Sequence, residues 1–297
     1  MKSFKKLFKK YRIDGYIVPK NDEYFNEYVP NYKNRLKFIS NFSGSAGFAV
    51  VLKNKNYLFV DGRYTIQARI QSGKKFKIIT IPNKLPKNTL RSNKKITLGF
   101  DPKLHTEKQL KFSFNIKNVY LKSISKNLVD LNWSKRPKEL LRPFYSLSTK
   151  NAGKSTEKKI SMVKNILLKK NIDYLLVTAP ENVAWILNIR GYDILHSPIP
   201  NCRLLINKKG EIQLFANPKK IKKIKKIKVR FHDEKNFEKI LNLISGKRIL
   251  LDTVSCSFFY KNLLSRKNKV IEKIDPIHFL KSIKNNTEIK NMKNIHL

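Results

Sequence analysis

The sequence predicts an α/β fold made of one unit that occurs twice. Residues 38–44 (FISNFSG) and 185–191 (WILNIRG) share an aromatic residue, Ile, Asn and Gly at the same spacing. An Asp with a short apolar run precedes each copy, at 14–18 and 173–177, and an apolar segment with a Lys/Asn turn follows each. The 297 residues also allow two domains of roughly 100–200 residues each.

The first half is expected to begin with a helix. Apolar side chains recur there at helical spacing, at Phe4, Leu7, Phe8 and Tyr11. A short apolar strand at 15–19 and a polar loop at 20–33 follow.

A turn of small residues, 43–47 (SGSAG), occupies the centre of the first half. Two apolar strands come next, at 48–52 and 57–60, with the polar turn KNKN between them. Residues 61–64 (DGRY) then lead into a helix, because apolar residues continue among polar ones. Further strands are predicted at 76–81, 96–100 and 118–121.

Residues 134–150, a polar stretch with two prolines, are interpreted as a linker. Ser155 is then a candidate N-cap for a helix with apolar residues at Ile160, Val163, Ile166 and Leu167. A strand is predicted at 174–178. Near the end, Pro276 interrupts the preceding element, and 279–297 show a helical pattern that we expect to begin another domain.

The net charge of +43 has two explanations. A strongly basic chain can bind nucleic acid through its phosphates. Here, however, Lys, Asn and Ile are enriched along the whole chain, as an AT-rich genome would produce. The one dense cluster, 219–230 (KKIKKIKKIKVR), has Ile at every third position, which favours a short amphipathic helix with a solvated lysine face. We therefore expect no specific nucleic-acid partner.

The sequence predicts neither a membrane span nor a secretion signal. No run of about 18 apolar residues occurs, and the N-terminus lacks the apolar region of a signal peptide. Cys202 and Cys256 form neither a CxxC motif nor a disulfide framework, which fits a reducing cytosol. We therefore expect a cytoplasmic protein with no membrane partner.

The sequence contains no recognisable motif for a metal site, a phosphate-binding loop or a catalytic nucleophile. The histidines are far apart, and no Asp/His/Glu cluster has ligand spacing. Residues 153–155 (GKS) imitate the end of a phosphate-binding loop, but Ser148 stands where its first glycine is needed. No catalytic residue and no metal ligand is assigned.

The best site candidate is the DGRY segment. Asp61 can cap the next helix, which is a structural role. Arg63 would then lie in the first turn, where the helix dipole disfavours a cation. An arginine there needs a partner, either a structural carboxylate or an anionic ligand group held by its planar guanidinium. A second polar cluster, 190–198, is interpreted as packing and turn, with no catalytic role for His196.

Together these segments resemble Xaa-Pro aminopeptidases of the three-domain type (aminopeptidase P, in the creatinase/prolidase superfamily). The resemblance runs from about Asp14 to the last residue and rests on the spaced set of pieces. The earlier pieces are residues 14–19, 27–28, 35–36, 43–47 and 59–64. The later pieces are residues 127–130, Trp133, 136–137, 184–185, 188–191, Asp193, 196–198, 284–285, 287–289, Met292 and His296.

The resemblance implies an α/β fold with two similar creatinase-N-terminal-like domains, each a mixed β-sheet flanked by helices. We expect the first domain at 1–145, the second at 151–276, and the first helix of a truncated "pita-bread" catalytic domain at 277–297. In the family, that third domain binds two divalent metal ions, often manganese, which activate the water that attacks the bond before proline. The same domain mainly mediates dimerisation, so we expect a homodimer only with it.

The resemblance also assigns the site. The arginine of the DGRY motif contacts the peptide in the family, so Arg63 is the expected substrate-binding residue, with Asp61 and Tyr64 as supports. We interpret the chain as the N-terminal, substrate-shaping portion of an Xaa-Pro aminopeptidase that acts on short peptides with proline second. Its metal ligands would lie downstream, so the chain alone is expected to be inactive. The alternative is a stand-alone, non-catalytic binding module with the creatinase-type fold.

Overall fold

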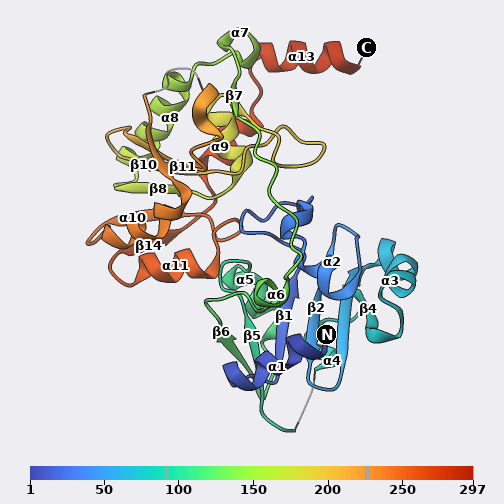
Figure 1. Cartoon of the computed structure of the whole chain (residues 1–297). Helices are drawn as coiled ribbons and strands as arrows, with labels where there is room; N and C mark the ends of the chain where they lie inside the picture. The colour runs from blue at the N-terminus through green and yellow to red at the C-terminus, as the bar shows by residue number, and fades with distance from the viewer. Residues whose placement is uncertain (91–92, 225–227, 297) are drawn as a thin grey trace. The chain divides into compact units, whose positions relative to one another are not determined.

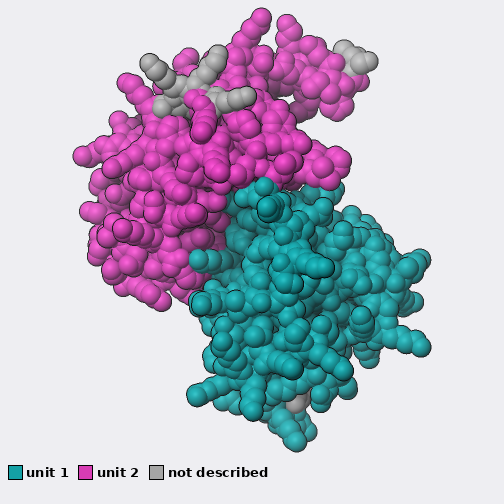
Figure 2. All heavy atoms as spheres, viewed as in Figure 1, with its two compact units in different colours: residues 1–139 teal, residues 140–297 magenta. Residues whose placement is uncertain are grey.

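The computed structural model describes residues 1–90, 93–224 and 228–296 (Figure 1). The chain divides into two compact units, Met1–Glu139 and Leu140–Leu297 (Figure 2). Each unit contains a six-stranded sheet of mixed parallel and antiparallel strands with helices beside it, as the sequence predicts. No helix in the described ranges is both long enough and apolar enough to cross a membrane.

In the first unit the strands are ordered β4-β3-β2-β1-β5-β6. They are β1 (Gly15–Pro19), β2 (Gly47–Leu52), β3 (Asn56–Asp61), β4 (Lys77–Ile81), β5 (Ile96–Phe100) and β6 (Val119–Ser123). The helices are α1 (Lys2–Tyr11), α2 (Arg35–Ser40), α3 (Thr65–Ser72), α4 (Pro86–Thr89), α5 (Glu107–Phe114) and α6 (Leu128–Asn132), with 3-10 turns η1 (Asn31–Lys33), η2 (Gly62–Tyr64) and η3 (Gly73–Lys75). Helix α1 buries Phe4 and Phe8 against Tyr16 and Val18 of β1, so the predicted first helix covers the central strand.

In the second unit the strands are ordered β12-β11-β10-β8-β13-β14. They are β8 (Tyr174–Val177), β10 (Arg203–Asn207), β11 (Ile212–Ala216), β12 (Arg230–Asp233), β13 (Arg248–Leu251) and β14 (Lys269–Glu272), and β7 (Tyr145–Ser146) pairs separately with β9 (Ile189–Arg190). The helices are α7 (Thr149–Ala152), α8 (Thr156–Lys169), α9 (Pro180–Leu187), α10 (Phe237–Leu243), α11 (Phe258–Ser265), α12 (Pro276–Ser282) and α13 (Asn286–His296), with η4 (Ile221–Lys223) and η5 (Glu234–Asn236).

Alternate residues of the second sheet face two separate cores. Leu175 and Val177 pack with α8 and α9, whereas Leu176 packs with Phe237 of α10 and Leu264 of α11. Successive side chains of a strand point to opposite faces, so this alternation places helices on both sides of the sheet (Figure 1).

The two sheets have the same topology, which confirms the predicted duplication. We number the six strands of each sheet in chain order, so that the central strand, β1 or β8, is the first. In both sheets this first strand is antiparallel to the second and parallel to the fifth. The second and third strands are antiparallel, and the third and fourth are parallel. The last two strands are parallel in both units.

The repeated aspartates make the same contacts in both units. The Asp14 carboxylate accepts hydrogen bonds from Lys53 Nζ at 2.6 Å and from the backbone N–H of Thr97 at 2.9 Å. Asp173 accepts from Lys208 Nζ at 2.8 Å and from the backbone N–H of Arg248 at 2.9 Å. Each aspartate thus joins the start of the central strand to its antiparallel and parallel neighbours, which explains why the residue recurs.

The repeated asparagines end equivalent helices. Asn41 follows α2 with φ 63°, and Asn188 follows α9 with φ 52°. Their backbone N–H groups bond to carbonyls in the last turn of the helix, and asparagine tolerates this left-handed conformation better than most residues. The motif found in the sequence is therefore a pair of matching helix ends.

Three expectations about particular segments are wrong. Residues 219–230 do not form one amphipathic helix. Among the described residues of this segment, Ile221–Lys223 form the 3-10 turn η4, Ile224 is extended and Arg230 begins β12, while Ile227 lies outside the described residues. The linker interpretation fails at 144–150, because Phe144 is fully buried and β7 pairs with β9. The helical pattern at 279–297 is divided between α12 and α13, with Ile283 extended between them.

Candidate functional site at the DGRY turn

The DGRY segment is a tight turn at the end of a buried strand. Strand β3 ends at Asp61, η2 carries the next three residues, and α3 follows directly. The Asp61 carboxylate accepts the backbone N–H of Arg63 at 2.9 Å and so caps η2, which is the structural role expected for it. Val60, which directly precedes Asp61, is fully buried, so the turn begins at the edge of the core.

Asp61 also binds the side chain of Arg63. Arg63 Nε donates to Asp61 Oδ1 at 2.9 Å, and Nη2 lies 3.4 Å from Oδ2. The side chains remain accessible, with 69% of Arg63 and 37% of Asp61 exposed. The predicted need for a partner is therefore met by a carboxylate two residues away. The hydrogen bond lowers the pKa of Asp61 and raises that of Arg63, so both stay charged.

The ring of Tyr64 contacts the guanidinium of Arg63. The Arg63 Cζ atom lies 5.4 Å from the centroid of the Tyr64 ring, within range of a cation–π contact. The ring packs edge-on against Phe42 at 5.7 Å, and its hydroxyl lies 2.9 Å from Ser45 Oγ. Phe42 and, from the SGSAG turn, Ser45 thus hold the Tyr64 ring in position against Arg63.

A network of amides ties the same turn to α3. Gln71 Oε1 accepts the backbone N–H of Ser43 at 2.8 Å, and Gln67 Nε2 donates to Ser43 Oγ at 2.9 Å. The roles of Ser45, Gln67 and Gln71 were not predicted from the sequence. Each makes its contact with a residue at least 19 positions away, Ser45 with Tyr64 and the two glutamines with Ser43, so spacing gave no signal.

The second unit has the same position with different residues. The strand registers align Ala49 and Leu58 with Leu204 and Leu214. Counting forward along β3 and β11, Asp61, Arg63 and Tyr64 correspond to Asn217, Lys219 and Lys220.

Lys220 is buried. Its counterpart Tyr64 instead contacts the exposed guanidinium of Arg63. The Nζ atom of Lys220 lies 2.7 Å from Asp193 Oδ1, and the Lys220 carbonyl accepts the backbone N–H of Phe144. The second copy of the turn therefore serves packing, and only the first presents an exposed, pre-oriented arginine.

The polar cluster at 190–198 makes contacts that hold the fold together. Arg190 Nη1 donates to the carbonyls of Ala184 and Ile189, at 3.1 and 2.9 Å. Asp193 accepts the backbone N–H of Asn201 at 2.7 Å. In the described part of the chain, no group of three or more His, Cys, Asp or Glu side chains is arranged to hold a metal ion.

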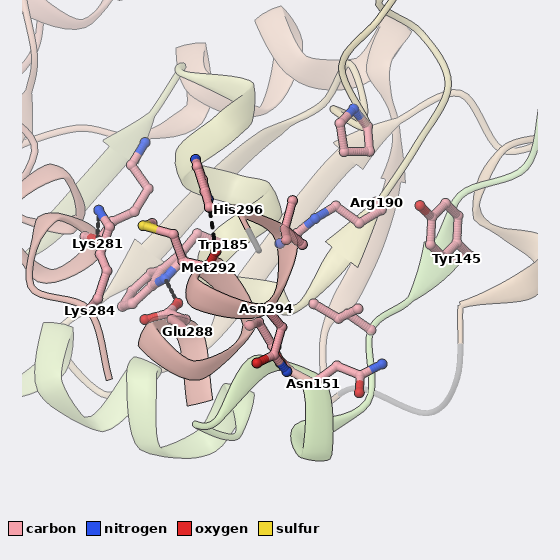
Figure 3. A pocket seen from close by; sticks show the side chains of 14 residues that line it. Tyr145, Asn151, Trp185, Arg190, Lys281, Lys284, Glu288, Met292, Asn294 and His296 are labelled. Carbon is pink, nitrogen blue, oxygen red and sulfur yellow. Dashed lines mark hydrogen bonds between the residues drawn. The ribbon is translucent and has the colours of Figure 1, made fainter. Parts of the chain in front are cut away.

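A groove of about 780 Å³ in the second unit was not anticipated from the sequence (Figure 3). It lies between β7, α9 and α13. Trp185, Arg190, Glu288, Met292 and His296 are among its lining residues. Trp185 Nε1 donates to Glu288 Oε1 at 3.1 Å across one end of it.

Comparison with known proteins gives a consistent result. Models of the creatinase/prolidase N-terminal domain match residues 1–130 and 135–288. The chain is 31% identical to a probable Xaa-Pro aminopeptidase P of Coprinopsis cinerea, over 99% of this chain and 52% of that protein. It is 30% identical to Xaa-Pro aminopeptidase 1 of Dictyostelium discoideum, over 96% of this chain and 48% of that one.

A solved structure shares the fold. The X-prolyl aminopeptidase of Caenorhabditis elegans, described as a cytosolic enzyme with a di-nuclear active site, superposes with a TM-score of 0.83 at 26% identity. The superposition covers 95% of this chain and 49% of that one. The chain thus spans about half the length of the relatives it matches. With two matched domains and the same fold, the chain belongs to the creatinase/prolidase N-terminal domain family, and its relatives are Xaa-Pro aminopeptidases.

Proposed function

We propose that this chain is the substrate-shaping and scaffold portion of an Xaa-Pro aminopeptidase, with Arg63 as the residue that contacts the peptide. The observation that carries the proposal is an exposed guanidinium held in one orientation by Asp61 and Tyr64. Asp61 occupies Nε and Nη2, and within the described residues no acceptor is bonded to Nη1. That edge can donate to a carbonyl or carboxylate of a short peptide.

The two copies of the turn support this assignment. A turn needed only to cap the next element could use Asn217 and Lys219, as the second unit does. The first unit instead holds an arginine between a carboxylate and an aromatic ring. This arrangement reduces the conformational entropy that Arg63 loses when it binds a ligand.

The proposed substrates are short peptides with proline at the second position, and the proposed location is the cytoplasm. The names of the relatives and the cytosolic C. elegans enzyme support both. Two divalent ions, often manganese in the family, would supply the activated water that cleaves the bond before proline. We assign those ions, and any homodimer contact, to residues outside this chain.

The test replaces the matched half of the C. elegans enzyme with this chain and measures hydrolysis of Xaa-Pro peptides. Arg63→Ala should lower kcat/KM by about tenfold to a hundredfold, the cost of one hydrogen bond to a charged group. Arg69→Ala, an exposed arginine on α3, is the matched control and should have no effect. Equal kinetics for the two variants would remove Arg63 from the site.

A further inference from the structure

The balance of charge is most one-sided in the first unit. Residues 62–129 contain sixteen Lys or Arg and two acidic residues, Asp101 and Glu107, against 64 and 21 in the whole chain. Of these two carboxylates, that of Asp101 is buried and that of Glu107 forms an ion pair with Lys111. This stretch therefore gives the first unit a strongly cationic surface.

A cleft of about 650 Å³ lies within this stretch. It is formed by α4, Asn93 and the loop between α5 and β6. Its lining includes Lys87 and Lys117, both exposed, together with four asparagines, and none of the described lining residues is acidic. Ammonium groups and amide N–H groups donate hydrogen bonds to the oxygens of an anion, so the cleft fits an anionic ligand.

The two carboxylates of the stretch lie at the far ends of the elements that form the cleft. Strands β5 and β6 are parallel; Asp101 follows the end of β5, whereas Asn118 precedes the start of β6. Glu107 begins α5, whereas Asn115 follows its last residue. Neither carboxylate therefore neutralises the lysines of the cleft.

Two exposed aromatic rings border the cleft. Phe112 of α5 is 63% exposed, and the Lys87 Nζ atom lies 5.8 Å from its ring centroid. Tyr120 of β6, two residues after Asn118, is 51% exposed, and the Lys95 Nζ atom lies 4.4 Å from its ring centroid. Each ring thus offers a surface for stacking beside an ammonium group that can bind an anion.

Cations, amides and exposed rings together indicate the chemistry of the occupant. An inorganic anion would use the lysines and leave the rings unused, and a duplex hides the faces of its bases. A single nucleic-acid strand presents phosphates and base faces at the same time. We propose that this cleft binds single-stranded nucleic acid. Lys87 and Lys117 contact its phosphates, while the rings of Phe112 and Tyr120 stack with its bases.

The proposed binding has no sequence preference, because an aromatic ring stacks with every base. It also uses a surface separate from the DGRY turn. Strands β3 and β6 run in the same direction; the turn follows the end of β3, and the cleft precedes the start of β6. The proposal therefore does not depend on the role of Arg63.

The first experiment measures binding of a fluorescein-labelled single-stranded DNA of mixed sequence and about fifteen nucleotides by fluorescence anisotropy. Binding is expected. Phe112→Ala and Tyr120→Ala should each raise Kd by about fivefold to a hundredfold, the effect of losing one stacked base. Phe279→Ala, 56% exposed in the second unit, is the matched control and should leave Kd unchanged. Absence of binding, or equal Kd values for all three variants, would overturn the proposal.

The second experiment separates the cleft from the net charge of the chain. Lys87→Gln combined with Lys117→Gln should reduce the slope of log Kd against log salt by about 1.4, which is about 0.7 for each phosphate contact. Lys209→Gln combined with Lys239→Gln removes the same charge from exposed sites of the second unit and should leave the slope unchanged. Equal effects of the two pairs would assign the binding to general attraction and overturn the proposal.

Competition identifies the ligand. Unlabelled single strand should displace the probe at lower concentration than a duplex of the same sequence, inorganic polyphosphate or a mononucleotide. Any of these three competing equally well would overturn the proposal, and an equal mononucleotide would identify a site for free nucleotides instead.

Photo-crosslinking of a bromouracil-substituted strand to the natural chain needs no variant, so a failure of folding cannot decide the outcome. The crosslinked peptides should contain Phe112 or Tyr120. Crosslinks confined to other segments would place the strand elsewhere and contradict the assignment to this cleft.

Discussion

The Nζ atom of Lys220 lies 2.7 Å from Oδ1 of Asp193, and the two side chains are only 3% and 2% exposed. The carbonyl of the same lysine accepts the N–H of Phe144, which is fully buried. One residue in a lysine-rich segment therefore anchors both the 190–198 loop and the segment that opens the second unit. This lysine is a core residue, unlike most of the others in the chain.

Replacing Lys220 by Met should destabilise the protein by about 3–5 kcal/mol, because the Asp193 carboxylate would stay buried without its cation. Denaturant unfolding measures the loss. Lys222→Met, an exposed neighbour, should change the unfolding free energy by less than about 0.5 kcal/mol. Similar values for the two variants would show that the ion pair does not hold this region.

Asp275 should give stability an inverse dependence on pH. Burial raises the pKa of its carboxyl from 3.8 to about 6, and nearby Asp252 adds repulsion. Because the folded state then binds the proton more tightly than the unfolded state, stability falls as the pH rises from about 4 to 6. The full change is about 3 kcal/mol at about 1.4 kcal/mol for each pKa unit.

The measurement compares the pH dependence of unfolding free energy in the natural chain and in Asp275→Asn. Asn182 Nδ2 donates to Asp275 at 2.8 Å, and Lys281 Nζ donates to Asn182 Oδ1 at 2.8 Å, so the variant has a constant cost of its own. Only the difference in slope between pH 4 and 6 reports the titration. Parallel curves would assign the ordinary pKa to Asp275.

The repeated aspartates should act independently. Asp14→Asn and Asp173→Asn each weaken a charge-assisted bond to a lysine and one to a backbone N–H, so each should cost about 1–3 kcal/mol. The two sites belong to different units, so the double variant should show the sum within about 0.5 kcal/mol. Strong non-additivity in chemical denaturation would mean that the two aspartate sites are energetically coupled.

The chain alone should not hydrolyse an Xaa-Pro-Pro tripeptide when Mn²⁺ is added. This prediction rests on the proposed function, which assigns the two metal ions to residues outside this chain. Chromatographic detection of the released first residue is the assay, and the fusion with the C. elegans half is the positive control. Metal-dependent turnover by the chain itself would contradict our view of its role.

Local signals gave the strands of the first unit and the duplication correctly. Strands β1 and β5 begin and end where their apolar runs do, and Ser155 caps α8 as expected. The short helices α2 and α6 were not predicted, since five or six residues give too little periodicity to recognise. Their caps, Asn34 and Asn127, were the only local indication.

Long-range packing decided the rest. Ile at every third position in 219–230 is typical of a helix. Ile221 and Ile224 instead pack against the core that α8 and α9 form in the second unit. Residues 145–146 are strand because they meet β9, forty-five residues away. The Arg63 turn was identified from its charge in an unfavourable position, but the Tyr64–Ser45 and Gln67–Ser43 contacts that orient it depend on how the turns fold together.

Strand order gives the excess of positive charge a physical role. In the described parts of the chain, the two six-stranded sheets end at β4, β6, β12 and β14, whose outer sides lack a partner strand. Each of these four carries an exposed cation: Lys77, Lys122, Arg230 and Lys269. Charged side chains on open edges hinder addition of a strand from another molecule. The lysines and arginines that give the chain its high net charge thus also disfavour aggregation through the four open sheet edges.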